Sequence, residues 1–81
     1  MHSDKMSHQQ MPVKIDDVME RILDIFEETD GYATTGYLVD EADSTRPTVT
    51  KRLDRLYAAD YIEYVHEPTA FWQLKKDPRS P

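Results

Sequence analysis

STRPTVTKRLDRLY, residues 44–57, is the one basic segment in an otherwise acidic chain. Four cations and one carboxylate give it a charge of +3, whereas the whole chain carries −6 at neutral pH. Its large apolar residues recur at the spacing of one helical face, at Val49, Leu53 and Leu56. Lys51, Arg55 and Thr48 fall on the opposite face. The segment therefore predicts a helix that is apolar toward its neighbours and cationic toward the outside.

The sequence also predicts where this helix begins. Ser44 or Thr45 can cap it, and Pro47 falls in the first turn, where its missing N–H costs nothing. We expect the helix to run over residues 45–58. An outer face of cations and hydroxyls suits the major groove of DNA, where N-terminal side chains of a helix reach base edges.

A longer helix is predicted upstream, from Ile15 to Thr29. Its apolar residues fall within an arc of roughly 160°, and acidic residues fill the rest. Asp16 and Asp17 sit in the first turn, where the helix dipole favours negative charge. Gly31 can take the left-handed conformation that ends the helix. We expect the acidic face to be solvated surface, with a protein-contact patch as the alternative.

Shorter elements complete the pattern. Residues 32–34 are expected to form a short strand, and Thr34 or Thr35 to cap a second helix that runs to Ala42. The β-forming runs 61–66 and 70–74, separated by Glu67-Pro68-Thr69, predict a hairpin. Its alternation places Trp72 and Leu74 toward the helices, and Phe71 and Gln73 outward.

Length and composition limit the architecture. With 81 residues and no cysteine, the chain is expected to form one small domain without disulfides. Its stability must come from apolar packing, to which a second subunit could add. We expect a disordered arm over residues 1–13, a folded domain over 14–76 and a disordered tail over 77–81. No run is long and apolar enough for a membrane span or a signal peptide, so we expect a cytoplasmic protein.

The acidic charge opposes the approach of DNA at low salt. Ten aspartates against six glutamates and five lysines are typical of a halophile's surface, with an ordinary acidic bacterial protein as the alternative. At about 1 M salt the screening length falls to about 3 Å. In a cell with high salt, the long-range repulsion between the acidic chain and DNA would be screened, and close contacts would determine the affinity for DNA.

The order of these elements resembles a winged helix-turn-helix domain of the α+β class, with three helices and a C-terminal hairpin wing. Residues 45–56 resemble the family's recognition helix, and residues 59–65 resemble the step from that helix into the first wing strand. With its acidic surface, the chain is most similar to phage-repressor-like transcriptional regulators of halophilic archaea, over about residues 15–75. The resemblance implies a recognition helix in the major groove and a wing over a neighbouring backbone or minor groove.

Position within the resemblance implies that five residues face DNA: Arg46, Thr48, Thr50, Lys51 and Arg55. Further candidate contacts are Arg52, Thr35 and, just beyond the hairpin, Lys75 and Lys76. Arg46 and Lys51 could pair with guanine O6 and N7, and the threonines with phosphate or a thymine methyl. Arg52 lies nearer the core edge, so we expect a backbone contact or a salt bridge to the first helix. Thr34 and Thr35 could meet a phosphate through free helix N-terminal amides. Each of these residues could instead serve only as a cap or as solvated surface.

The hairpin tip departs from the family. It lacks the arginine that commonly enters a minor groove, and Glu67 would be repelled there. Deep insertion is therefore not expected.

An enzyme is not expected, because there is no nucleophile–base pairing, Gly-rich phosphate loop or metal-spaced ligand set. No cofactor, metal or small-molecule ligand is expected either. The predicted function is sequence-specific binding of double-stranded DNA by a small transcriptional regulator, with repression by occlusion as the simplest mode. A domain this small buries about 600–1,000 Å² on DNA, so we expect a homodimer on a two-fold symmetric operator. The alternative is a winged-helix module for protein–protein interaction.

Overall fold

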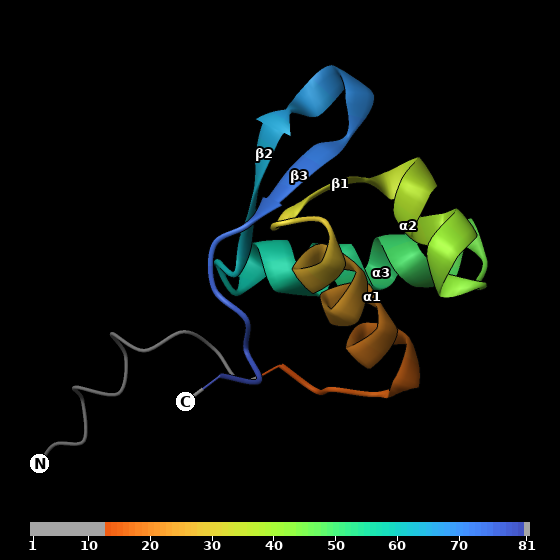
Figure 1. Ribbon diagram of the computed structural model, residues 1–81, viewed down its shortest axis with the longest axis vertical. Coiled ribbons are helices and arrows are strands. Elements are labelled where there is room, and N and C mark those ends of the chain that lie inside the picture. The colour runs from red at the N-terminus through yellow and green to blue at the C-terminus, as the bar shows by residue number, and fades with distance from the viewer. Residues whose placement is uncertain (1–12, 81) are drawn as a thin grey trace, which may run out of the picture.

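The computed structural model describes residues 13–80, which form three α-helices and a three-stranded antiparallel sheet (Figure 1). The predicted α+β class is confirmed. In chain order the elements are α1 (Asp17–Glu28), β1 (Tyr32–Thr34), α2 (Thr35–Ala42), α3 (Arg46–Ala58), β2 (Ile62–His66), the 3-10 turn η2 (Glu67–Thr69) and β3 (Phe71–Leu74).

Each helix begins at a residue whose side chain accepts a hydrogen bond from the first turn. The Asp16 carboxylate accepts from the Met19 amide at 2.9 Å, and starts α1. Thr34 rather than Thr35 caps α2, and Thr45 rather than Ser44 caps α3. Both predicted cap positions are confirmed, and the alternatives that the sequence left open are resolved.

The sheet has the order β1-β3-β2, so the last strand of the chain lies in the middle. The predicted hairpin is confirmed as β2 and β3, which extend beyond the helices with η2 at the far end (Figure 1). β1 pairs with the other edge of β3 and sets Ala33 opposite Trp72. The pairing of β2 with β3 shifts register between Tyr64 and His66. A bulge of this kind twists an edge strand and discourages pairing with other chains.

The core lies between the helices and one face of the sheet. Trp72 is only 3% exposed, and Leu74 packs against the core, as the alternation predicts. The largest fully buried side chains are Phe26, Met19, Ile22, Leu23, Ile25, Leu38, Leu53, Leu56, Ile62 and Val49. On the other face of the sheet the Phe71 ring lies 6.0 Å from the Tyr32 ring, and Gln73 donates a hydrogen bond to the Tyr32 hydroxyl.

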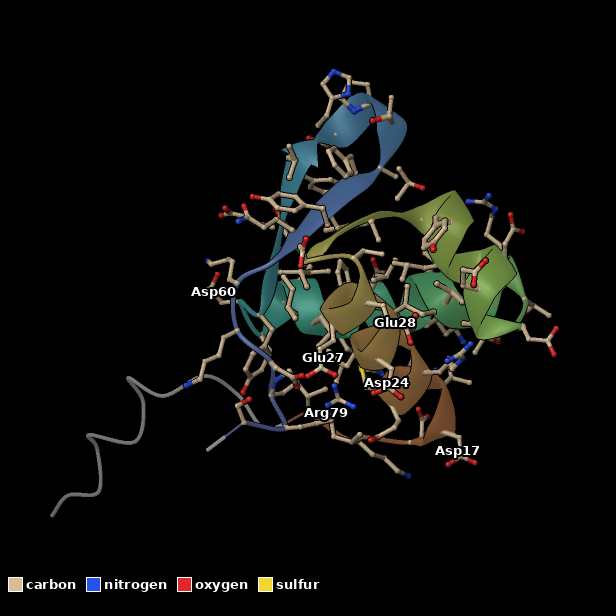
Figure 2. The ribbon with its side chains drawn as sticks, in the orientation of Figure 1. Asp17, Asp24, Glu27, Glu28, Asp60 and Arg79 are labelled. Carbon is tan, nitrogen blue, oxygen red and sulfur yellow. The ribbon has the colours of Figure 1, made fainter. Side chains whose placement is uncertain are left out.

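The structure describes most of the segment after β3, in which the sequence predicts a tail over residues 77–81. Residues 77–80 lie against α1, where the Arg79 guanidinium meets two carboxylates of that helix, Glu20 at 3.0 Å and Asp24 at 2.7 Å (Figure 2). Asp77 binds the same guanidinium at 2.8 Å, and Arg79 also donates its backbone N–H to Asp77. The acidic face of α1 therefore attracts the one arginine of the tail, Arg79.

The predicted arm falls mostly outside the described residues, and only Val13 of it can be placed, packed against the core. Within residues 13–80 no helix has the length and apolar character needed to cross a bilayer.

Candidate nucleic-acid interface

The N-terminal end of α3 is built from hydroxyl groups and a cation. Thr45 accepts a hydrogen bond from the Thr48 amide and donates its own hydroxyl to the Thr48 oxygen at 2.9 Å. The Thr48 hydroxyl therefore keeps its proton for another acceptor. Arg46, the first residue of the helix, is exposed, and Pro47 takes the second position without losing a hydrogen bond.

Three cations of α3 face solvent. Arg46, Lys51 and Arg55 are exposed, and within residues 13–80 none of them forms an ion pair with a carboxylate. Thr50 is exposed beside them. Val49, Leu53 and Leu56 are buried on the other side of the helix. The predicted amphipathic helix is confirmed, and five of the nine predicted contact residues share its outer surface: Arg46, Thr48, Thr50, Lys51 and Arg55.

The guanidinium of Arg46 also reaches the start of α2. A side-chain carbon placed on Gly36 would lie 3.8 Å from the Arg46 Nη2. The positive end of the α2 dipole and the Arg46 charge therefore meet at one corner of the molecule. This corner adjoins the N-terminal turn of α3.

Arg52 takes the alternative that the sequence left open, an ion pair with the first helix. Its guanidinium binds the Asp16 carboxylate at 2.6 Å, with a second contact from Nε at 2.9 Å. These hydrogen bonds, together with the one from the Met19 amide, lower the pKa of Asp16 to about 2. Arg52 thus joins α3 to the capped end of α1. Its position near the core edge explains why it pairs inward.

Thr35 is placed in the interior rather than at the surface. Its side chain accepts a hydrogen bond from the indole N–H of Trp72 at 2.9 Å, and the residue is 7% exposed. Its backbone N–H donates to the Ala70 carbonyl at 3.0 Å. The Tyr37 amide is likewise occupied by Thr34. The Thr35 side chain and the backbone N–H groups of Thr35 and Tyr37 are therefore engaged within the protein.

Lys75 and Lys76 follow β3, at the opposite end of α3 from Arg46. Lys75 binds Asp60, and this hydrogen bond raises the pKa of its ammonium group above the ordinary value. Lys76 is exposed, and its backbone N–H donates to the Tyr61 carbonyl. Since the thirteen residues of α3 span about 20 Å, these lysines do not belong to the cationic corner.

An aromatic cluster that the sequence did not reveal fixes the hairpin to α3. Tyr64 and Trp72 stack with ring centroids 3.9 Å apart, and the Tyr57 ring packs edge-on against both, at 5.4 and 5.6 Å. Burial, followed by the charges of Glu67 and Asp54, raises the pKa of Tyr64. Tyr57 and Tyr64 belong to different elements, so their contact depends on long-range packing that the sequence pattern does not contain.

No group of three or more metal-ligating side chains gathers within the described part of the chain. Comparison of the chain with protein-family models and with curated proteins finds no match.

Proposed function

We propose that this chain is a winged helix-turn-helix domain that binds double-stranded DNA as a small transcriptional regulator, with α3 as the recognition helix. One observation carries the proposal. In a chain with sixteen carboxylates, Arg52, Lys75 and Arg79 are drawn into ion pairs. Six described cations form no ion pair within residues 13–80. Three of these six, Arg46, Lys51 and Arg55, lie together on α3, where they are available to phosphates and base edges.

The arrangement of elements supports the same proposal. A short helix, a tight turn and a second helix are followed by an antiparallel hairpin, which is the order of a winged helix-turn-helix. The tight turn includes Asp43 in the left-handed conformation, with φ 54°. Thr45 then caps α3, so that its N-terminal turn lies at the exposed end of the motif.

The hairpin has a limited part in this proposal. Its tip holds the side chains of His66, Glu67, Pro68 and Thr69, with no arginine or lysine among them. His66 Nδ1 lies 3.0 Å from the Thr69 hydroxyl, so this pair is satisfied within the turn. We propose that the wing stays outside the minor groove, because Glu67 would be repelled by the phosphates that line it.

The proposal is tested by electrophoretic mobility shift with bulk genomic DNA over a series of salt concentrations. We expect the wild-type chain to bind, and the double variant Lys51→Ala/Arg55→Ala to bind at least tenfold more weakly, with a shallower dependence on salt. Lys14→Ala, which removes an exposed cation before α1, is the matched control and should bind as wild type. Absence of a shift at every salt concentration would contradict DNA binding and favour a protein-interaction module.

A homodimer is part of the proposal, because one small domain covers only about 600–1,000 Å² on DNA. Two copies would place two α3 helices in successive major grooves, about one helical turn apart. Light scattering at high salt and high protein concentration checks this. A strictly monomeric protein, free and on DNA, would contradict it.

A further inference from the structure

Asp54 is the one carboxylate in the basic segment, residues 44–57. It is exposed on α3, three residues after Lys51 and directly before Arg55. An aspartate and a lysine three residues apart on a helix are well placed to pair. Within residues 13–80, however, the Asp54 side chain forms neither an ion pair nor a hydrogen bond.

Asp54 lies close enough to the hairpin for its negative charge, after burial and the charge of Glu67, to help raise the pKa of the Tyr64 phenol on β2. Tyr57, three residues later on α3, packs against the same Tyr64 ring. Asp54 therefore lies on the outer part of α3 that borders the wing, whereas Arg46 lies at the other end of the helix, beside Gly36.

A carboxylate at this position selects among bases by hydrogen-bond chemistry. An ionised aspartate only accepts hydrogen bonds, and it is repelled by phosphates. In the major groove, guanine offers two acceptors and thymine an acceptor with a methyl group, so neither suits a carboxylate. Adenine presents an amino donor, but its N7 acceptor lies beside that donor and would repel a carboxylate. Cytosine presents only the N4 amino donor. Cytosine is therefore the base that a carboxylate on this face fits.

We propose that Asp54 is a specificity-determining residue that selects cytosine at one base pair of each half-site, an inference that rests on the proposed DNA binding by α3. Lys51 and Arg55 supply attraction to the duplex on either side of it in the sequence. The negative charge of Asp54 lowers the general affinity for DNA, because phosphates repel it. The same carboxylate disfavours the three bases other than cytosine at its position.

The inference is tested by selecting bound sequences from random duplex DNA with the wild-type chain, Asp54→Asn and Asp54→Ala. Glu28→Gln, which removes an exposed carboxylate from α1 (Figure 2), is the matched control. We expect a cytosine in the wild-type and control sites. Asp54→Asn should change that preference to adenine, since an asparagine pairs with adenine N6 and N7. Asp54→Ala should lose the preference and bind non-specific DNA more tightly.

The same substitution can be measured as an affinity ratio. Replacing the selected cytosine with thymine should weaken wild-type binding about 5- to 100-fold, and weaken Asp54→Ala binding less than twofold. If all four proteins bind and select one identical sequence, Asp54 reads no base and the inference is overturned while DNA binding stands. If the wild-type chain selects no DNA at any salt, the proposed function fails and this inference fails with it.

Discussion

Three of the ten aspartates end helices in a conformation that few residues tolerate. Asp30, Asp43 and Asp60 have φ values of 60°, 54° and 68°, and each follows the last turn of a helix. Aspartate enters the left-handed region more readily than most side chains, because its short carboxylate can bond to the local backbone. The abundance of aspartate in this chain therefore has a role in chain reversal as well as in surface charge.

Asp43 allows this role to be measured, since it is exposed and lies in the tight turn between α2 and α3. Glycine has no steric cost in the left-handed region, whereas alanine lacks both that freedom and the carboxylate. We expect Asp43→Gly to raise the free energy of unfolding by about 0.5–1 kcal/mol and Asp43→Ala to lower it by a similar amount. Urea denaturation of the two variants checks this, and an Asp43→Ala protein more stable than Asp43→Gly would contradict it.

The Asp16–Arg52 ion pair gives the fold a defined pH dependence. Folding lowers the pKa of Asp16 from 3.8 to about 2. The ionised carboxylate therefore stabilises the fold above about pH 4, and this contribution is lost as the pH falls through 2. Asp16→Asn keeps a capping side chain but not the charge.

We expect Asp16→Asn to lower the free energy of unfolding by about 1–2 kcal/mol at pH 7, with allowance for solvent screening of a partly exposed pair. The difference from wild type should shrink at pH 4 and again at pH 3. Urea denaturation at the three pH values measures it. A difference that does not change with pH would show that the charge of Asp16 contributes nothing.

At the scale of elements, local chemistry predicted the helices and the hairpin, but not which threonine turns inward. Thr34 and Thr35 are both good caps, and the sequence does not distinguish them. The choice is made by pairing of β1 with β3, which brings Trp72 beside Thr35, 37 residues away in the chain. Such a contact is invisible to periodicity. Because the sequence does not show the contact with Trp72, it predicted a phosphate contact for Thr35, which is buried.

The bond between Thr35 and Trp72 should stabilise the junction of the sheet with α2. Thr35→Val has nearly the same shape but leaves the buried indole N–H without its acceptor. We expect a loss of about 1–3 kcal/mol in the free energy of unfolding. Thr35→Ser, which keeps the hydroxyl, is the control and should lose less. Equal losses for the two variants, measured by thermal denaturation, would mean that packing and not the hydrogen bond stabilises this junction.

At the scale of the whole molecule, ion pairs hold the segment after β3 against α1. Composition predicted a disordered tail because residues 77–81 hold two prolines and no large apolar residue. That composition does not reveal the partners of Arg79. They are Glu20 and Asp24, which lie 59 and 55 residues earlier in the chain. The cationic face of α3, in contrast, was predictable because all its residues belong to one helix.

The Arg79 cluster should stabilise the fold modestly and in a salt-dependent way. The pKa of the guanidinium is raised mainly by the hydrogen bonds that it donates to the Asp77 and Asp24 carboxylates. We expect Arg79→Ala to lower the free energy of unfolding by about 1 kcal/mol at low salt and by less at high salt. Lys76→Ala, which removes an exposed cation of the same segment, should have little effect. A loss for Arg79→Ala that does not fall with salt would place its contribution in packing instead.

The central claim is that the outer face of α3 meets DNA, and amide chemical shifts test it most directly. Isotope-labelled protein is titrated with a duplex taken from the selected sequences, at a salt concentration where the protein binds. We predict that the largest shifts fall on Arg46–Ala58, with smaller ones at Gly36 and few on the outer face of the sheet. Shifts concentrated at Tyr32, Phe71 and Gln73, with α3 unchanged, would contradict the account.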